Sequence, residues 1–208
     1  PGVLQGHALI PTQIGCMHIT HMEQLGQGSS ARIGDVMART KSGYGASRAN
    51  YMAQLVVERM TGKQTEMFTN AAMQWGTDTE PLARAAYEAH NNVMVDETGL
   101  VDHPTIPMSG ASPDGLIGEH GMLEIKCPNT ATHIDTLLTG KIDEKYIYQM
   151  QWQMACTGRK WCDYVVFDPR MPENLQLCVR RVERDDYIID EIKSEIKKFL
   201  AELDQQVN

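Results

Sequence analysis

Residues 112–126 have the sequence SPDGLIGEHGMLEIK, and this stretch decides the predicted fold. Two short apolar runs, Leu116-Ile117 and Met122–Ile125, flank the loop residues 118–121. A loop with a glycine at each end, between two such runs, is typical of a β-hairpin. The stretch therefore predicts two antiparallel strands joined by a tight turn, and a sheet that contains them.

Chemically active side chains gather in this hairpin. Side chains alternate between the two faces of a strand, so Glu124 and Lys126 project to one side while Ile125 turns into the core. Asp114 would lie at the open end of the hairpin, beside both. Two neighbouring carboxylates repel each other, which either raises a pKa or requires a cation. Mg²⁺ binds oxygen ligands and keeps several waters, so Asp114, Glu124 and the Ile125 carbonyl would suffice to hold it.

The same residues also have an ordinary structural interpretation. The sequence Ser-Pro-Asp-Gly at 112–115 is a common type I turn, and Glu-x-Lys on a strand is often a solvated face. If the metal site exists, Lys126 would orient or deprotonate an attacking water and stabilise the charge that develops on the phosphate. From these residues alone, both interpretations stay open.

The rest of the chain predicts helices first, then a small mixed sheet, then further strands and a terminal helix. Helices are expected at 32–38, 47–61, 69–90, 131–139, 143–157 and 188–203. Ser47 is expected to cap the second helix and Gly62 to end it, and the third is expected to be interrupted near Gly76 and Pro81. Strands are expected from 93, at 161–167 and at 175–179, with edge strands at 100–101 and 106–108. The pattern predicts an α/β or α+β domain, a central mixed sheet flanked by helices.

Composition favours one domain over residues 1–208, of which 1–31 are expected to be irregular. No window resembles a membrane span or a signal peptide, so a membrane is not an expected partner. Five cysteines without a Cys-x-x-Cys pair predict free thiols in a reducing cytoplasm and disfavour zinc or iron–sulfur sites. The net charge of −8 argues against a general nucleic-acid coat, although carboxylates that hold metal ions count in that sum.

Several motifs, in order along the chain, resemble those of the PD-(D/E)xK nucleases and in particular the phage lambda exonuclease branch, the YqaJ-like viral recombinases. The matching motifs are Trp75-Gly76 with Glu80, Ser112–Leu116, Leu123–Pro128, Tyr148–Gln151 and Asp168–Met171. They extend over roughly residues 20 to 205. The resemblance implies a restriction-endonuclease-like core and two Mg²⁺ ions per site, with Mn²⁺ as an alternative ion.

The resemblance also implies a role for each matching residue of the hairpin. Asp114, Glu124 and the Ile125 backbone carbonyl would bind Mg²⁺. Lys126 would position the nucleophilic water. Two metal ions about 4 Å apart can stabilise both the attacking and the leaving oxygen of an in-line phosphodiester hydrolysis.

Two helical residues complete the implied catalytic set. Glu80 would serve the second metal ion or its water, and Gln149 would contact the metal site or the scissile phosphate. Each has a structural alternative. Glu80 lies three residues after Thr77, which fits a capping box, and one turn before Arg84, which fits an ion pair. Gln149 and Gln153 lie four apart on a helix, which fits a polar face.

Other residues have weaker functional signals. Trp75 and Trp161 are more typical of core or interface aromatics than of base-stacking platforms. His133 is expected to cap or pack near a helix start. Lys41 and Arg48 would contact backbone phosphate, or lie on a solvated surface.

The segment that should hold the 5′-terminal phosphate departs from the family. The family pattern of Arg-x-Gly followed by Thr-Ala-Ser falls on Gln24-Leu25-Gly26 and Ser29-Ser30-Ala31 here. Losing a bidentate Arg–phosphate pair is not a conservative change. Ser29, Ser30 and Arg32 are the nearby residues that would replace the lost donors, with Gln24 at the position of the arginine.

The resemblance implies a function for the whole chain. It predicts stepwise 5′ to 3′ digestion of one strand from double-stranded DNA ends, with release of mononucleotides and a 3′ single-stranded tail. It further implies a homotrimeric ring and a single-strand annealing protein as partner, in phage or prophage recombination in a bacterial host cytoplasm. The alternatives are a structure-specific endonuclease of the same fold and a catalytically silent DNA-binding module.

Overall fold

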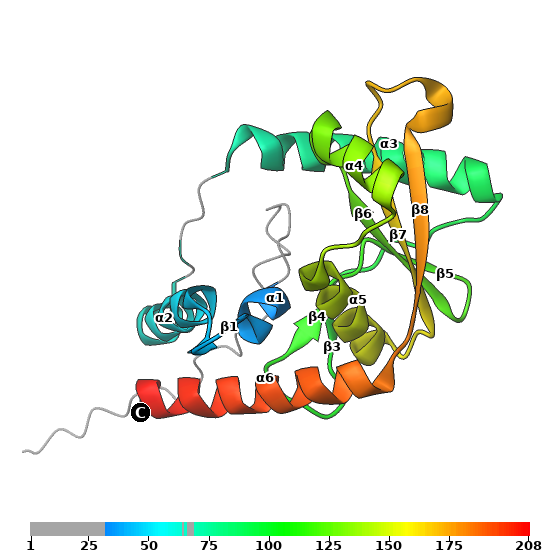
Figure 1. The fold of residues 1–208 in the computed structure, drawn as a ribbon. Helices are drawn as coiled ribbons and strands as arrows, with labels where there is room; N and C mark the ends of the chain where they lie inside the picture. Colours follow the sequence, from blue (N-terminus) through cyan, green and yellow to red (C-terminus); the bar gives the residue numbers. More distant parts are fainter. Residues whose placement is uncertain (1–31, 64, 66–68) are drawn as a thin grey trace, which may run out of the picture.

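A mixed four-stranded sheet forms the centre of the computed structural model, which describes residues 32–63, 65 and 69–208 (Figure 1). Its strands, in spatial order, are β5 (Gly115–Ile117), β6 (Gly121–Lys126), β7 (Trp161–Phe167) and β8 (Leu177–Glu183). β6 is antiparallel to β5 and parallel to β7, and β8 is antiparallel to β7. The predicted α/β class with a central mixed sheet is confirmed.

The predicted hairpin is present and pairs β5 with β6. Gly115 lies opposite Leu123, and the pairing closes at Ile117 and Gly121. Gly118 begins the turn with φ of +51°, a left-handed conformation that glycine adopts at low cost. Gly121 leaves room for the neighbouring strand, because a Cβ there would lie 2.2 Å from the ring of Trp161.

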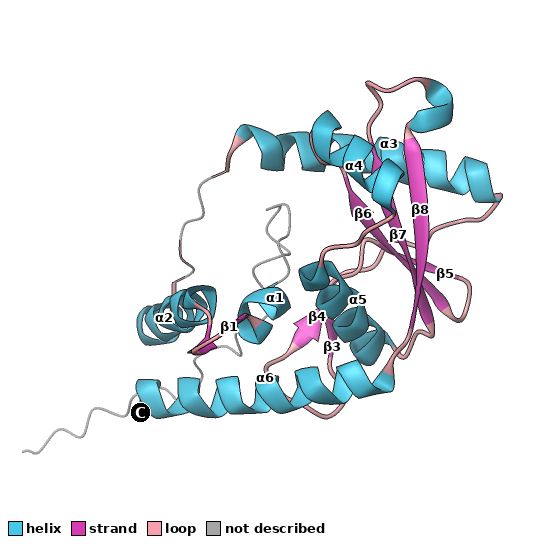
Figure 2. Ribbon diagram, viewed as in Figure 1, coloured by secondary structure: helices cyan, strands magenta, loops and turns pink. Residues whose placement is uncertain are grey.

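Helices cover both faces of the sheet (Figure 2). α3 (Ala71–Asn91) covers one face, and α4 (Thr130–Thr139) and α5 (Glu144–Thr157) pack on the other. Alternate residues of the strands therefore enter two different cores. The α3 side holds Leu123, Ile125, Val165 and Phe167, and the α5 side holds Met122, Cys162, Tyr164 and Val166.

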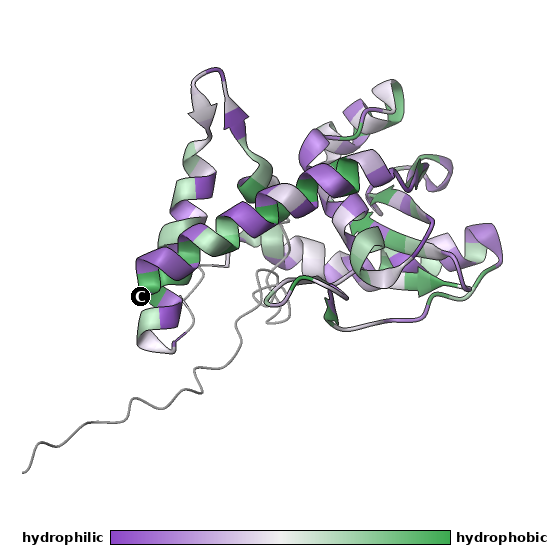
Figure 3. Cartoon of the chain, turned by 90° about the horizontal axis from the view of Figure 1, so that it is seen from below, coloured by the Kyte–Doolittle hydropathy of each residue, from purple (hydrophilic) through white to green (hydrophobic). Residues whose placement is uncertain are grey.

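A helical layer forms a further hydrophobic core. It contains α1 (Arg32–Met37), α2 (Ala46–Thr61) and α6 (Asp186–Val207), which meet residues of α5 such as Trp152. α6 is the amphipathic terminal helix that the sequence predicts, and Figure 3 shows hydrophobic and hydrophilic residues recurring along it. α5 thus contacts the sheet with one side and the helical layer with the other.

The minor strands differ from the prediction. Two small ladders pair β1 (Arg39–Thr40) with β2 (Gly43–Tyr44) and β3 (Val101–Asp102) with β4 (Gly110–Ala111). The expected strand from residue 93 is wrong, since that segment forms only one bridge, between Asp96 and Leu116. The expected edge strand at 106–108 is also wrong, because these residues form a turn closed by the side chains of His103 and Ser109.

Two helix predictions need correction. α3 runs without interruption through Gly76 and Pro81, and it begins at an Asn70 cap whose side chain accepts from the Met73 amide. α2 begins at Gly45 without a side-chain cap, so Ser47 does not cap it. Gly62 ends α2 as predicted, in the left-handed conformation.

Within the described ranges, none of the helices has the length and apolar character that crossing a membrane requires.

Candidate active site

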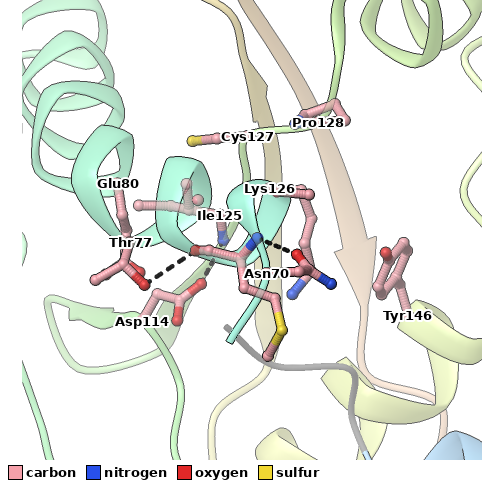
Figure 4. A pocket seen from close by; sticks show the side chains of 12 residues that line it. Asn70, Thr77, Glu80, Asp114, Ile125, Lys126, Cys127, Pro128 and Tyr146 are labelled. Carbon is pink, nitrogen blue, oxygen red and sulfur yellow. Dashed lines mark hydrogen bonds between the residues drawn. The ribbon is translucent and has the colours of Figure 1, made fainter. Parts of the chain in front are cut away.

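The hairpin and α3 border a pocket of about 270 Å³ (Figure 4). Glu80 and Thr77 line it from α3, Asp114 from the turn before β5, and Lys126 from the end of β6. Tyr146, near the start of α5, forms the opposite wall. The structure therefore brings together the hairpin residues and the α3 carboxylate that the sequence singled out.

Asp114 is fixed by the strand that carries the other site residues. Its Oδ2 accepts a hydrogen bond of 2.6 Å from the backbone N–H of Ile125. Burial raises the pKa of Asp114 well above its usual range, and the negative charges of Glu124 and Glu80 raise it further. The carboxylate is thus held in place in a position where its charge is poorly compensated.

Glu124 is fully buried and has two partners of different kinds. Its Oε1 lies 2.5 Å from the ammonium of Lys126, and its Oε2 accepts a bond of 2.8 Å from the side-chain amide of Gln153. Ile125, between Glu124 and Lys126, faces the opposite core. The alternation that the sequence predicts along this strand is confirmed.

Lys126 is a cation in this surrounding. Burial alone lowers its pKa, but the carboxylates of Glu124 and Asp114 outweigh that effect and raise the pKa above its usual value. The ammonium also lies 5.0 Å from the ring centre of Tyr146, within the range of a cation–π contact. Lys126 therefore offers N–H donors and positive charge to whatever enters the pocket.

Glu80 reaches the pocket from the middle of α3 and pairs with Arg84. The guanidinium Nη2 lies 2.7 Å from Glu80 Oε1 and also donates to the backbone carbonyl of Asp114 at 3.2 Å. The ion pair with Arg84, considered from the sequence, is confirmed. The capping box with Thr77 is wrong, because α3 begins at Ala71 and Thr77 lies in its interior.

The charges of these side chains suit Mg²⁺. Burial raises the pKa of Glu80, as it does that of Asp114, and Glu124 adds to the rise. Three carboxylates beside two cations, Lys126 and Arg84, thus leave one negative charge uncompensated. No three Asp, Glu, His or Cys side chains in the described residues are arranged closely enough to chelate an ion by themselves. Mg²⁺ does not need three, because it retains waters and accepts backbone carbonyls such as that of Ile125.

The two glutamines of the α5 polar face differ in position. Gln153 holds Glu124 directly, whereas Gln149 is buried and is not among the residues lining the pocket. Gln149 Oε1 has no hydrogen-bond partner in the described part of the chain. Nothing in the sequence distinguishes Gln153 from Gln149, since both lie on the same helical face.

The predicted DNA-contacting residues differ in their surroundings. Gln24, Ser29 and Ser30 lie outside the described residues, as does Ala31 at the position of the family serine. Arg32 donates to Gln54 at 2.6 Å and pairs with Asp35 at 3.2 Å, so it ties α1 to α2. Lys41 is exposed in the β1–β2 turn.

Arg48 has a structural role instead of the predicted contact with DNA. Its two terminal nitrogens bind the Glu202 carboxylate at 2.7 and 3.1 Å, and its guanidinium covers the ring of Tyr44. Only 6% of the residue is exposed. It therefore joins α2 to α6, and phosphate would have to displace a bidentate pair to reach it.

The remaining aromatic and histidine predictions follow their structural alternatives. Trp75 packs beneath the guanidinium of Arg170, and Trp161 beneath that of Arg181. His133 is fully buried, with Nε2 2.7 Å from the carbonyl of Leu175. None of the three lines the pocket formed by the described residues.

The chain is similar in sequence and fold to known proteins. Residues 21–160 match the model of the YqaJ-like viral recombinase domain. The crystal structure of LHK-Exo in complex with dAMP is 54% identical, covers 89% of this chain and 91% of that chain, and has a TM-score of 0.80. A second structure, an alkaline exonuclease (LHK-Exo) from Laribacter hongkongensis, is 53% identical over 89% and 92% of the two chains, also with a TM-score of 0.80.

A more distant structure shares the fold alone. A phage-related exonuclease from Haemophilus somnus 129PT is 14% identical over 85% of this chain and 92% of that chain, with a TM-score of 0.67. A search among curated proteins gave no match. The family match extends over most of the chain and includes Glu80, Asp114, Glu124 and Lys126, so the chain belongs to the YqaJ-like viral recombinase family.

Proposed function

We propose that this protein is a Mg²⁺-dependent DNA exonuclease with a restriction-endonuclease-like PD-(D/E)xK core. The observation that carries the proposal is the grouping of Asp114 and Lys126 at one pocket, with Glu80 facing them from α3 and the buried Glu124 paired with Lys126 directly behind the pocket wall. Paired carboxylates beside a lysine are suited to metal-assisted hydrolysis of phosphodiesters. The similarity to structures described as exonucleases, one of them bound to dAMP, supports DNA as substrate and mononucleotides as products.

Each residue has a task that follows from its surroundings. Asp114, Glu124 and the Ile125 carbonyl would hold Mg²⁺, and Glu80 would serve a second ion or its water. Bound Mg²⁺ supplies Lewis-acid stabilisation of the phosphate and lowers the pKa of a coordinated water. Lys126, kept protonated by its neighbours, would orient the attacking water and stabilise the charge on the phosphate.

The direction of digestion and the assembly are further parts of the proposal. On the family resemblance, we expect 5′ to 3′ digestion that leaves a 3′ single-stranded tail, Mn²⁺ as an alternative ion, and a homotrimeric ring around DNA. A single-strand annealing protein would act on the tail during recombination in the bacterial host. Gln149, Lys41 and Arg32 stay as candidate phosphate contacts within the described chain.

A linear duplex with a different label at each end of one strand tests the activity and its direction. With Mg²⁺ we expect the 5′-end label to be released first as mononucleotide, and with EDTA no release. Earlier release from the 3′ end would overturn the direction, and omission of the 5′ phosphate tests the role of the region around Gln24. Closed circular DNA should stay intact, because cleavage of circles would indicate an endonuclease. The Lys126→Met variant should be inactive, which excludes a contaminating nuclease.

A further inference from the structure

The side chain of Gln153 links the two segments that carry Asp114 and Glu124. Its Nε2 donates to Glu124 Oε2 at 2.8 Å and to the backbone carbonyl of Ser112 at 3.3 Å. Ser112 lies two residues before Asp114, in the turn that precedes β5. A single amide group from α5 therefore contacts both the strand and the turn of the proposed metal site.

The chemistry of an amide suits this position. An amide NH₂ has two hydrogens, so it can serve the carboxylate and the carbonyl at the same time. It is also neutral, so it orients the Glu124 carboxylate without cancelling the charge that a metal ion requires. A lysine or arginine in its place would compete with the ion for that charge.

The surroundings of Gln153 make it a rigid support. The residue is 1% exposed, and its neighbours Met150 and Met154 on α5 pack against the sheet. α5 is therefore fixed to the strands independently of the glutamine. A side chain on such a helix can hold a carboxylate within the narrow range of positions that metal coordination needs.

A second side chain, from α3, also holds the turn that contains Asp114. Arg84, on α3, donates to the Asp114 carbonyl and to the Glu80 carboxylate. The turn is thus attached to α5 through Gln153 and to α3 through Arg84. The attachment through Gln153 also orients Glu124, and the one through Arg84 also orients Glu80.

We propose that Gln153 is a positioning residue that sets the spacing and orientation of Asp114 and Glu124 for metal binding. The inference rests on the proposed metal-dependent function of this pocket. Residues that hydrogen-bond to metal ligands commonly change metal affinity by about 10- to 100-fold when replaced. A residue that only stabilises the fold would change the midpoint of thermal unfolding and leave metal affinity unaltered.

The test compares Gln153→Met with Gln151→Met in the full chain. Gln151 is a matched control, because it lies on the same helix, is 2% exposed and makes its two hydrogen bonds away from the pocket. Its side-chain amide donates to the Glu183 carbonyl and accepts from the Asp185 backbone N–H, both at 2.8 Å. Mn²⁺ alone, without DNA, is the probe, and its affinity is measured by calorimetry or by the electron paramagnetic resonance signal of the free ion.

We expect Gln153→Met to weaken Mn²⁺ binding by about 10- to 100-fold and Gln151→Met to leave it within about twofold of the native protein. Native affinity in Gln153→Met would overturn the inference, as would an equal loss in both variants. If Gln153→Met does not fold, the Mn²⁺ affinity of Gln153→Asn is measured instead. This variant has the same amide on a shorter side chain, and the same weakening of Mn²⁺ binding is expected. Absence of Mn²⁺ binding in the native protein would instead contradict the proposed function itself.

Discussion

The burial of Asp114 makes the stability of the metal-free protein depend on pH. Its pKa in the folded protein lies well above the usual 3.8, chiefly through burial. Between those two pKa values the folded chain keeps a proton that the unfolded chain has lost. The free energy of unfolding of the metal-free protein therefore decreases as the pH rises through that interval, and the loss is complete above the folded pKa.

We expect Asp114→Asn to stabilise the metal-free protein at pH 8, because an amide oxygen can still accept the bond from Ile125 but carries no charge. A gain of about 1 kcal/mol would raise the unfolding midpoint by about 2–4 °C in a domain of this size. Thermal unfolding in EDTA measures the stabilisation of the metal-free protein, and thermal unfolding in Mg²⁺ measures the effect of metal binding. Mg²⁺ should raise the midpoint of the native protein and not that of the variant, and a lower midpoint for the variant in EDTA would contradict the argument.

Arg84 offers a separate prediction, since it orients Glu80 and the carbonyl of Asp114 at once. Lysine keeps the positive charge but lacks the planar fork that allows several directed bonds. Arg84→Lys should therefore lower kcat by about 10-fold or more with a small change in KM for DNA. Arg180→Lys, at an exposed position on β8, is the control and should keep native kinetics. Equal rates for the two variants would show that Arg84 does not act on the site.

The sequence predicts the hairpin residues of the site because their relation is local. Glu124 and Lys126 lie two apart on one strand, and alternation alone puts them on the same side. Gln153 and Arg48 could not be assigned in this way, because their partners are 29 and 154 residues distant. Which polar residue of a helix turns toward a carboxylate depends on how that helix packs, and periodicity does not contain this information.

At the scale of elements, α3 shows why local signals mislead. Proline in a helix interior removes one hydrogen bond and costs about 3 kcal/mol, which explains the predicted interruption near Pro81. The helix continues because residues beyond the proline are anchored in the core. Ala83 and Tyr87 are buried against the sheet, and before the proline Trp75 packs under Arg170. Tertiary packing of this kind is outside the reach of a local pattern.

The segment after β7 ties three elements together through Asp168. Its carboxylate accepts a bidentate pair from Arg170 at 2.7 and 3.0 Å and a hydrogen bond from Thr130 at 2.6 Å. Arg170 in turn covers Trp75 of α3. Mainly through the bonds from Arg170, the pKa of Asp168 falls to about 2. The ionised Asp168 carboxylate therefore stabilises the fold above pH 4, and this stabilisation is lost as the pH falls toward 2.

We expect Asp168→Asn to lower the free energy of unfolding at neutral pH by about 2 kcal/mol, because the buried position loses a charged acceptor shared by two donors. Urea unfolding at pH 7 and at pH 3 measures the loss. The difference between variant and native protein should shrink at the lower pH. Asp186→Asn, which removes an exposed pair with Arg184, should change stability by less than about 0.5 kcal/mol. A similar effect of both variants would contradict the assigned role of Asp168.

At the scale of the whole molecule, α5 joins the core beneath the sheet to the core of the helical layer. The helical layer in turn depends on α6. Phe199 is fully buried there and stacks on Tyr51 of α2 at 5.4 Å between ring centres. Phe199→Ala should cost about 3–5 kcal/mol, since the cavity lies between packed helices. Denaturant unfolding measures this loss, and Lys197→Ala, at an exposed position of the same helix, is the control. A loss below about 1 kcal/mol would show that the layer adapts to the missing ring.

If the pocket binds Mg²⁺ as proposed, the overall charge predicts that the ion takes part in DNA binding as well as in hydrolysis. The chain carries a net charge of −8, and two of its carboxylates, Glu80 and Asp114, line the pocket that phosphate would enter, with Glu124 buried behind it. A divalent ion in the pocket inverts the local field and attracts the phosphate backbone.

We therefore expect Ca²⁺, which binds oxygen ligands but replaces Mg²⁺ poorly in catalysis, to strengthen binding of duplex ends by about 10-fold or more over EDTA. Fluorescence anisotropy of an end-labelled duplex at fixed ionic strength measures this. The Asp114→Asn variant, which lacks one of the proposed ligands, should respond weakly to Ca²⁺. Equal affinity of the native protein in Ca²⁺ and in EDTA would mean that surfaces remote from the pocket hold the DNA end, and that the acidic site contributes only to cleavage.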